Sequence, residues 1–370
     1  MSQRAQTLTN HSHRSLHYLA ATELETLAPG IVLQRSLTTK SIVITTSSYS
    51  TRYQESSVRV EAQKYHEIGA GFQGVVYEQL GNTYVTKKER LTNQGLTLHD
   101  EFIMHRKVWD AFAKYKEYSS NVRVPQPYYF VAEGCLPFWL LPRMPENDRN
   151  LSDIVTMERI LPLPKVVRRA MIQKFYPDKN IACDEHRVTQ ILGERANKHC
   201  LARVYLGVET LATSKESFSL RNFPLTLDLM VELGLDVAHF AAMIGNAYAI
   251  MHWAANITGD DVEFVFGTST SPSNNNRYRG VHMYLLDFGQ CDSVNMKGNK
   301  EDVFQALKGS MVLHQNQIYL PHPSRNTELY QAWKSAYLST SRKIIRREGL
   351  SFDPEEFLYG YEEYLEYLGI

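Results

Sequence analysis

Three glycines near the start of the chain have a spacing that suits phosphate binding. Gly69, Gly71 and Gly74 form the pattern G-x-G-x-x-G between two strand-like runs. Glycine lets a backbone approach a phosphate closely and point N–H groups at it. A plain hairpin turn would use the same residues, but the strand-like run on each side favours a loop that covers a phosphate. We therefore expect these glycines to bind a phosphate-bearing ligand.

A lysine, a glutamate and an aspartate follow in an order that extends this chemistry. Lys87 ends the next strand-like run, with Lys88 as the alternative one position later, and Glu101 lies in the helical pattern that follows. Much further on, the apolar run in "HMYLLDFG" leads to Asp287 in an Asp-Phe-Gly sequence. This order resembles that of protein kinases, in which the lysine pairs with the glutamate and helps to bind the nucleotide, while the aspartate holds a metal. An exposed lysine and a surface glutamate are the alternative.

The segment between these motifs lacks the base that a kinase needs. A kinase catalytic loop reads H-R-D-x-x-x-x-N and supplies a base and a metal ligand. Here "MHWAANITGDDVEFVFG" keeps His252, which we expect to pack beneath the loop. If "EFVF" is the strand after the loop, Glu263 takes the asparagine position and Thr258 the base position. The neighbouring acids Asp260 and Asp261 leave a displaced base open.

Several longer strings are similar to those of one fungal family. They are "TMERILPLPKVVRRAMI", "KHCLARVYLG", "FSLRNFPLTLDLM", "MHWAANITGDDVEFVFG" and "LLDFGQC". From about residue 61 to its end, the chain resembles a family loosely labelled zinc-finger-like that includes arginine-containing cyclodipeptide synthases. The resemblance implies an enzyme that joins arginine to a second amino acid as a diketopiperazine. Its substrates would be arginyl-tRNA and a second aminoacyl-tRNA, with arginyl-tRNA synthetase as a further partner.

This implied chemistry suits the altered catalytic segment. An aminoacyl ester is already activated, so the reaction needs two captured acyl groups, a free α-amine and a stabilised oxyanion. No cofactor would be required, and a cleft of the ATP-binding type would hold the terminal adenosine of the tRNA. Arginine selection calls for a bidentate carboxylate, for which Asp260, Asp261 and Glu263 are candidates and a solvated acidic turn is the alternative. The catalytic candidates are Asp261, Glu263, Asp287 and Glu101.

Binding of tRNA also requires a basic surface, because phosphate contacts supply most of the affinity. Two strings supply clustered cations, which are Lys165, Arg168, Arg169 and Lys174 in the first and Arg342, Lys343, Arg346 and Arg347 in the second. The formal net charge is zero, so such patches would be local, and neither DNA nor a membrane is expected as a partner. A solvated helix face is the alternative for both.

The composition predicts a globular protein of the cytoplasm. The chain has 370 residues, of which 43% are hydrophobic and 22% charged, as in ordinary folded domains. No apolar run approaches the ~20 residues of a membrane span, and the N-terminus lacks the apolar stretch of a secretory signal. The four cysteines lie far apart and without zinc-ligand spacing, so we expect reduced thiols and no metal site.

These motifs need a two-lobed scaffold to bring them together. Strand-like runs from residue 65 to 89, a helical pattern and further Pro-bounded runs predict a small antiparallel sheet with one helix. Long helical patterns after Pro164 predict a larger lobe. We therefore predict an α+β, protein-kinase-like fold with an N-terminal arm over 1–60, an N-lobe over 61–150 and a mainly helical C-lobe over 151–370. The arm is polar and is expected to be partly disordered or to hold one short helix.

Three classes of function remain open. The first is the tRNA-dependent cyclodipeptide synthase, which the resemblance favours. The second is a phosphotransferase that uses ATP and Mg²⁺ on a small molecule or a protein, which the glycines, Lys87, Glu101 and Asp287 favour. The third is a pseudokinase-like binding protein without catalysis, which Thr258 in the base position also fits.

Overall fold

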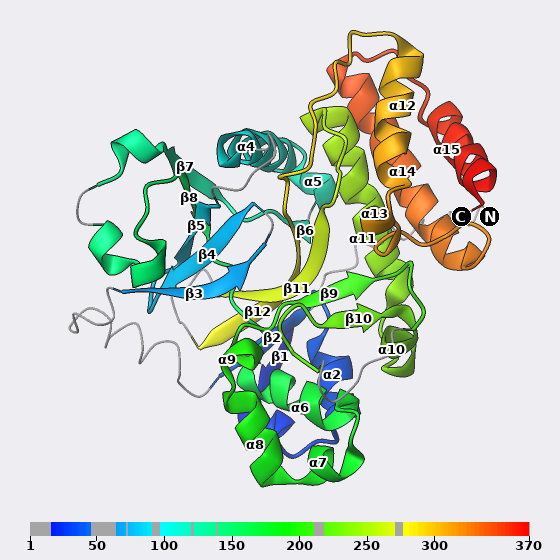
Figure 1. Cartoon of the computed structure of the whole chain (residues 1–370). Coiled ribbons are helices and arrows are strands. Elements are labelled where there is room, and N and C mark those ends of the chain that lie inside the picture. The colour runs from blue at the N-terminus through cyan, green and yellow to red at the C-terminus, as the bar shows by residue number, and fades with distance from the viewer. Residues whose placement is uncertain are drawn as a thin grey trace, which may run out of the picture.

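The computed structural model describes residues 16–45, 64–71, 73–90, 97–119, 122–137, 140–210, 218–270 and 277–369. The described strands form two sheets, and helices surround the larger one (Figure 1). The α+β class is confirmed.

The smaller sheet is antiparallel and has the order β3-β4-β5-β8-β7. Its strands are β3 (Tyr65–Ala70), β4 (Gly74–Gln79), β5 (Tyr84–Glu89), β8 (Ile154–Glu158) and β7 (Pro127–Val131). Helix α4 (Leu98–Lys114) lies against this sheet (Figure 1). The side chain of Thr97 accepts a hydrogen bond from the backbone N–H of Asp100 and so caps the helix N-terminus.

The larger sheet is mixed and curls like half a barrel. Its order is β1-β2-β12-β11-β9-β10, and β6 pairs with β12 away from this path. The strands are β1 (His17–Ala20), β2 (Ser41–Ile44), β12 (Tyr278–Leu286), β11 (Glu263–Thr270), β9 (Ala202–Tyr205), β10 (Pro224–Thr226) and β6 (Val122–Arg123). The antiparallel hairpin of β11 and β12 is its centre and carries two of the predicted site residues to one end.

Helices cover the larger sheet in two groups (Figure 1). One group is α1 (Ala21–Leu24), α2 (Pro29–Ser36), α6 (Lys165–Phe175), α7 (Lys179–Cys183), α8 (Glu185–Gly193), α9 (Arg195–Lys198) and α10 (Leu227–Glu232). The other is α5 (Lys116–Ser119), α11 (Val237–Ile250), α12 (Lys300–Met311), α13 (His314–Gln317), α14 (Thr327–Glu348) and α15 (Pro354–Leu368). Within the described part of the chain, no helix is both long and apolar enough to span a bilayer.

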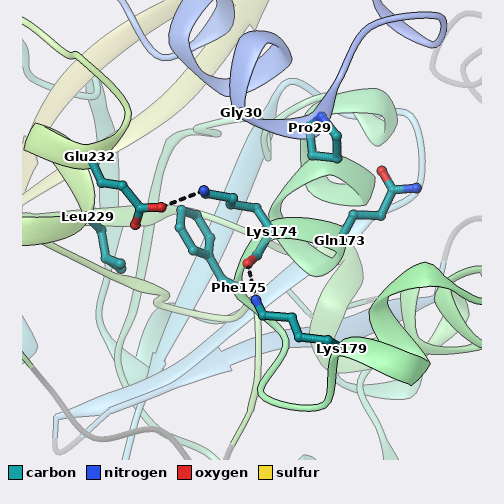
Figure 2. A pocket seen from close by; sticks show the side chains of 8 residues that line it. All are labelled: Pro29, Gly30, Gln173, Lys174, Phe175, Lys179, Leu229 and Glu232. Atoms are coloured by element: carbon teal, nitrogen blue, oxygen red, sulfur yellow. Dashed lines mark hydrogen bonds and ion pairs between the residues drawn. The ribbon is translucent and has the colours of Figure 1, made fainter.

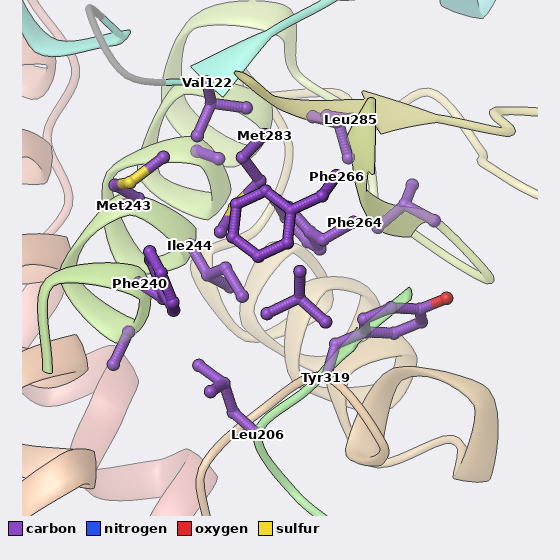
Figure 3. Close-up of a cluster of buried hydrophobic side chains, with 14 of the residues drawn as sticks. Val122, Leu206, Phe240, Met243, Ile244, Phe264, Phe266, Met283, Leu285 and Tyr319 are labelled. Atoms are coloured by element: carbon purple, nitrogen blue, oxygen red, sulfur yellow. The ribbon is translucent and has the colours of Figure 1, made fainter. Parts of the chain in front are cut away.

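The main hydrophobic core lies between α11 and the central hairpin of the larger sheet. Figure 3 shows Phe240 and Ile244 of α11 facing Phe264 and Phe266 of β11. These side chains are buried, and the rings of Phe240 and Phe266 meet edge to face with centroids 5.1 Å apart. Burial of such side chains stabilises the fold by about 1.5–3 kcal/mol each. The core therefore fixes the strands whose ends carry the candidate site.

A π-helical turn (Met251–Ala255) continues α11 into the segment that carries Thr258, Asp260 and Asp261. His252 and Trp253 are fully buried in this turn, as expected. The Tyr337 hydroxyl lies 3.0 Å from Nδ1 of His252 and accepts a hydrogen bond from Nε1 of Trp253 at 3.0 Å. Burial lowers the pKa of His252 to about 3, so its ring is neutral. These two residues hold the segment in place from beneath.

The structure differs from the N-terminal arm predicted over residues 1–60, which was expected to be partly disordered or to hold one short helix. The described part of this range forms β1, α1, α2 and β2. Strand β2 pairs with β12, with Ile44 opposite Tyr278, and α2 buries Val32 and Leu33. The pairing partner lies more than 200 residues away in the sequence, so local composition carries no sign of it. The parts of the arm at 1–15 and 46–60 lie outside the described residues.

The predicted boundary between the lobes also differs from the structure. Strand β6 falls within 61–150 but pairs with β12 in the larger sheet, whereas β8 lies beyond residue 150 but belongs to the smaller sheet. The region 151–370 contributes β9 to β12 as well as its helices, so the description "mainly helical" is incomplete. Short strands such as these give little periodicity to read in a sequence.

Gly245 allows α11 and α14 to pack closely and gives a direct test of this contact. A Cβ on Gly245 would lie 2.4 Å from the backbone oxygen of Trp333, which belongs to the helical backbone of α14 and is not the end of a flexible side chain. We expect Gly245→Ala to lower the free energy of unfolding by about 1–3 kcal/mol through overpacking. Urea unfolding followed by circular dichroism measures this change.

Gly309 in α12 is the matched control, because a Cβ added there would have no atom of the described residues within 4 Å. Gly309→Ala should raise the free energy of unfolding by about 0.5–1 kcal/mol, since alanine favours the helix. Equal stabilities for the two variants would contradict the close packing of α11 on α14.

Candidate functional site

Lys87 and Glu101 form a buried ion pair between β5 and α4. The ammonium of Lys87 lies 2.8 Å from Oε1 and 2.6 Å from Oε2 of Glu101. Lys88 projects to the other face of the sheet, as neighbouring strand residues do, and donates to Asn150 at 3.0 Å. Burial alone would lower the pKa of Lys87, but Glu101 and Asp287 raise it above its ordinary value. Burial raises the pKa of Glu101, the ammonium of Lys87 opposes this rise, and the charge of Asp287 adds to it.

Asp287 joins this pair from the end of β12. Its Oδ1 lies 4.0 Å from Nζ of Lys87, and its side chain is 40% exposed, so it borders an opening beside the ion pair. The backbone φ of Asp287 is 67°, which residues other than glycine rarely adopt and which is typical of functional turns. The buried Phe288 packs on His105 of α4, with ring centroids 5.1 Å apart. The Asp-Phe-Gly turn is thereby fixed against the helix that carries Glu101.

Glu263 begins β11 beside Asp287 and is bound by Arg203 of β9. The strand register places Glu263 opposite Leu286, the residue before Asp287. The Arg203 guanidinium donates to Oε1 of Glu263, and both side chains are mostly buried. Burial raises the pKa of Glu263 to about 7, with Arg203 opposing the rise and Asp287 adding to it. A carboxyl group with this pKa exchanges a proton near neutral pH.

Asp261 brings another carboxylate to the same region. It is half-buried, and its backbone φ is 52°. Burial raises its pKa, and the negative charge of Asp287 raises it further, although Arg203 acts in the opposite direction. Neighbouring carboxylates repel each other, and a cation that binds between them relieves this repulsion. Three of the predicted catalytic acids, Asp261, Glu263 and Asp287, are thus brought together.

Thr258 occupies the predicted base position and has a structural role. Its hydroxyl donates to Oδ2 of Asp260 at 2.7 Å and accepts from the backbone N–H of Asp292 at 3.0 Å. Its own carbonyl accepts a hydrogen bond from the hydroxyl of Ser310 at 2.5 Å. A hydroxyl held in this way has no basic character at neutral pH. Thr258 therefore positions Asp260 and does not replace the missing aspartate of a kinase.

The glycine-rich loop has two glycines that its surroundings do not explain. A Cβ on Gly74 would lie 2.5 Å from the backbone oxygen of Lys88, so the approach of β4 to β5 requires glycine there. At Gly71 no described atom lies within 4 Å of such a Cβ, and at Gly69 the nearest is Val76 Cβ at 3.9 Å. Open space beside a glycine backbone is what a ligand in close contact would use.

The predicted RNA-binding cations on α6 are largely engaged within the protein. Arg168 donates to two backbone carbonyls, at 3.0 and 2.7 Å, and so serves the local fold. Arg169 pairs with Glu185 of α8. Lys165 is exposed and has no such partner among the described residues. Of these three cations, only Lys165 offers its charge to solvent without first breaking a contact.

The predicted cations on α14 show a similar pattern at a different place. Arg342 pairs with Glu355, while Lys343 and Arg347 contact residues of α5. Arg346 is exposed and has no partner in the described part of the chain. Helix α6 and the end of α14 that meets α5 lie on different sides of the molecule (Figure 1). The structure therefore does not join the two predicted patches into one surface.

A hollow of about 520 Å³ lies beside α6 and away from the cluster of Lys87 and Asp287 (Figure 2). Its lysines are bound by the protein itself. Lys174 lies 2.5 Å from Oε1 of Glu232, and Lys179 donates to the backbone oxygen of Lys174 at 2.9 Å. Lys174, which the sequence suggests for RNA binding, is thus already paired.

Two residues beside this cluster were not singled out from the sequence. Arg203 is a lone cation within the apolar strand "ARVY", and that mismatch is the signal that would have marked it. Gln73 lies inside the glycine-rich pattern, and nothing in that pattern indicates that its side chain is buried. The contacts that involve these two residues in the site form only in the folded chain, where the two sheets lie next to each other.

Comparison with known proteins gives one partial match. The family model DUF3669, described as zinc finger protein, matches residues 283–349, which run from β12 through the Asp-Phe-Gly turn to the end of α14. No curated protein matches the chain. The described residues hold no group of three or more His, Cys, Asp or Glu side chains arranged for a metal ion.

The ion pair of Lys87 and Glu101 can be tested by a double-mutant cycle. Lys87→Met should lower the free energy of unfolding by about 3–5 kcal/mol, because it leaves a buried carboxylate without its partner. The double change Lys87→Met with Glu101→Leu should recover most of that loss, because no buried charge remains. Urea unfolding measures both. A cost below about 1 kcal/mol for Lys87→Met alone would mean that the pair is not buried.

The raised pKa of Glu263 predicts a pH-dependent stability. The folded protein keeps this proton up to about pH 7, whereas the unfolded chain releases it near 4.5. The favourable contribution of the protonated group is therefore complete below pH 4.5 and is lost as the pH rises through 7. Glu263→Gln lacks this titration, so its stability relative to the native protein should increase by up to about 3 kcal/mol across that range.

Urea unfolding of both proteins at several pH values measures this difference, and every other titrating group is common to the two. A difference that stays constant from pH 4.5 to 7 would show that the carboxyl of Glu263 titrates normally.

Proposed function

We propose that the chain is a tRNA-dependent cyclodipeptide synthase, built on a kinase-like scaffold, that joins arginine to a second amino acid. The observation that carries this proposal is the cluster of Lys87, Glu101 and Asp287 beside a base position that holds Thr258. Such a cleft would grip a nucleotide but lacks the aspartate that accepts a hydroxyl proton in phosphoryl transfer. Formation of a peptide bond from activated esters does not need that aspartate.

The smaller sheet supports the kinase-like part of the proposal. Its order β3-β4-β5-β8-β7, with α4 inserted between β5 and β7, corresponds to the small lobe of a protein kinase. The paired lysine and glutamate then fall on the third strand and on the single helix, as they do in kinases. The contact of Phe288 with His105 further supports a cleft between this sheet and the larger unit.

The acidic opening supports arginine as one substrate. Asp261 and Asp287 raise local negative charge, and the neighbouring Glu263 already binds one guanidinium, that of Arg203. A guanidinium prefers carboxylates that can accept two parallel hydrogen bonds. We therefore assign the side chain of the substrate arginine to Asp261 and Asp287, with Asp260 held nearby by Thr258.

The proposed reaction balances without a cofactor. The α-amine of one aminoacyl ester attacks the carbonyl carbon of the other, an amide bond forms, and the ester bond to the first tRNA breaks. The remaining amine then attacks the second ester, which closes the ring and releases the second tRNA. Each amine loses one proton and each departing 3′-oxygen gains one, so a group with a pKa near 7 can carry both transfers. Glu263 is our candidate for that group.

The cleft would hold the terminal adenosine of the tRNA, and the phosphate backbone would run over the surface. Lys165 and Arg346 are the predicted cations available for phosphate contacts without loss of an ion pair. Exposed pairs such as Arg169 with Glu185 are worth about 0–1 kcal/mol, so a phosphate can replace the glutamate at little cost. Arginyl-tRNA synthetase is a proposed partner, because it would supply the charged tRNA.

The test is incubation of the protein with purified arginyl-tRNA and a mixture of other aminoacyl-tRNAs, followed by mass spectrometry. We expect an arginine-containing cyclic dipeptide that disappears when the tRNA is first digested with ribonuclease. Asp287→Ala should lower product formation by about 100-fold or more, because it removes a carboxylate that we assign to holding the guanidinium of the substrate arginine in the reactive position. Circular dichroism and thermal unfolding should show that this variant remains folded.

Asp110→Ala is the matched control, because Asp110 is an exposed aspartate on α4. This variant should form the product at the native rate. Absence of any cyclic dipeptide from the native protein with every charged tRNA would reject the proposal, and loss of folding in Asp287→Ala would assign Asp287 to structure.

A phosphotransferase is the second candidate, and the geometry of Lys87, Glu101 and Asp287 favours it. It would use ATP and Mg²⁺, with Asp287 as the residue that holds the metal and Asp260 or Asp261 as a displaced base. Transfer of labelled phosphate from ATP, without a cyclic dipeptide, would support this function. A protein that binds nucleotide and catalyses neither reaction would be a binding module of the pseudokinase type.

A further inference from the structure

The side chain of Gln73 fills the space between the glycine-rich loop and the Asp-Phe-Gly turn. Gln73 is only 4% exposed, and its Nε2 donates to the backbone oxygen of Gly289 at 2.8 Å in a buried hydrogen bond. A Cβ on Gly289 would lie 1.7 Å from Oε1 of Gln73. Any residue other than glycine at position 289 would thus expel the Gln73 side chain. The two residues, more than 200 positions apart, form one closely packed contact.

The loop that carries Gln73 is held in this closed position by further bonds. The backbone N–H of Gly71 donates to the carbonyl of Gly74 at 2.9 Å, and the backbone N–H of Arg90 donates to the carbonyl of Gln73 at 3.0 Å. The Arg90 guanidinium also donates to the carbonyl of Gly71 at 3.0 Å. The chain on both sides of Gln73 is therefore fixed to β4 and β5, and its amide is aimed at the turn.

In a kinase, the β- and γ-phosphates of ATP lie between the glycine-rich loop and the metal-binding aspartate. That aspartate corresponds to Asp287, two residues before Gly289. A glutamine side chain in this space carries no positive charge to balance phosphates. Entry of a triphosphate would also break a buried hydrogen bond and leave a polar group unpaired.

We propose that Gln73 determines specificity by closing the polyphosphate end of the cleft, so that the site accepts a nucleotide with a single 5′-phosphate and excludes ATP. The terminal adenosine of a tRNA meets this condition, because its 5′-phosphate is a single diester and its acyl group is on the ribose. The identity of this ligand rests on the proposed function. The exclusion of the triphosphate rests on the contact of Gln73 with Gly289 and on the kinase-like placement of the phosphates, and it does not depend on the acyl-transfer reaction.

The test compares AMP with ATP in the presence of Mg²⁺, using isothermal calorimetry on the native protein and on Gln73→Ala. The native protein should bind AMP at least about tenfold more tightly than Mg·ATP, which is the effect of one hydrogen bond that must be broken. Gln73→Ala should bind Mg·ATP about tenfold or more tightly than the native protein does. Its affinity for AMP should stay within about twofold, since the single phosphate does not reach the amide.

Two further variants keep the test decisive. Gln73→Asn shortens the side chain by one methylene and should give a smaller gain in ATP affinity than Gln73→Ala. This variant replaces Gln73→Ala in the test if Gln73→Ala does not fold. Gln190→Ala, on the exposed face of α8, should leave both affinities unchanged. Equal ATP affinities for the native protein and a folded Gln73 variant, or binding of neither nucleotide by any variant, would overturn the inference.

The outcome is separable from that of the proposed function. A gain of ATP binding in Gln73→Ala, together with no cyclic dipeptide from the native protein, would retain the role of Gln73 and reject the synthase. A cyclic dipeptide from the native protein, together with unchanged nucleotide selectivity in Gln73→Ala, would support the synthase and reject the role of Gln73.

Discussion

The buried ion pair of Lys87 and Glu101 is the contact on which the arrangement of the cleft depends. An ammonium and a carboxylate out of water are tolerated only when they satisfy each other, so the pair sets the position of α4 on the smaller sheet. Helix α4 in turn carries His105, which packs on Phe288 and fixes the turn that presents Asp287. The contacts of α4 with the Asp-Phe-Gly turn therefore join the smaller sheet to the larger one, and the candidate site lies beside them.

Under the proposed function, the chain keeps around this point the parts that would grip a nucleotide and changes those that would move a phosphate. The position of the kinase base is given to Thr258, whose hydroxyl is used to hold Asp260. The position of the metal-binding asparagine is given to Glu263, which is bound by Arg203 and has a pKa of about 7. Gln73 fills the space where the outer phosphates of ATP would lie. In that proposal each change removes a requirement of phosphoryl transfer, and acyl transfer between esters needs none of the replaced groups.

The sequence predicts the parts of this site that are local. The three glycines, Lys87 and Asp287 are recognisable because a strand and a turn place them within short motifs. The pairing of β2 with β12, the contact of Gln73 with Gly289 and the pair of Arg203 with Glu263 join residues that are 60 to more than 200 positions apart. The hydrophobic periodicity of the sequence does not reveal such contacts, because each of them depends on how distant strands and loops are arranged in the fold. The ion-pair partners of the basic strings, such as Glu185 and Glu355, come from other helices, so the sequence alone does not show which of these cations are already paired.

The central claim is that this cleft binds an aminoacylated adenosine and uses its carboxylates to select arginine. A crystal structure with a stable amide analogue of 3′-arginyl-adenosine tests it most directly. We expect the adenosine between the two sheets and the guanidinium within ion-pair distance of Asp261 or Asp287. A structure with the analogue elsewhere on the protein, or with ATP and a metal held between Asp287 and Glu263, would contradict the claim.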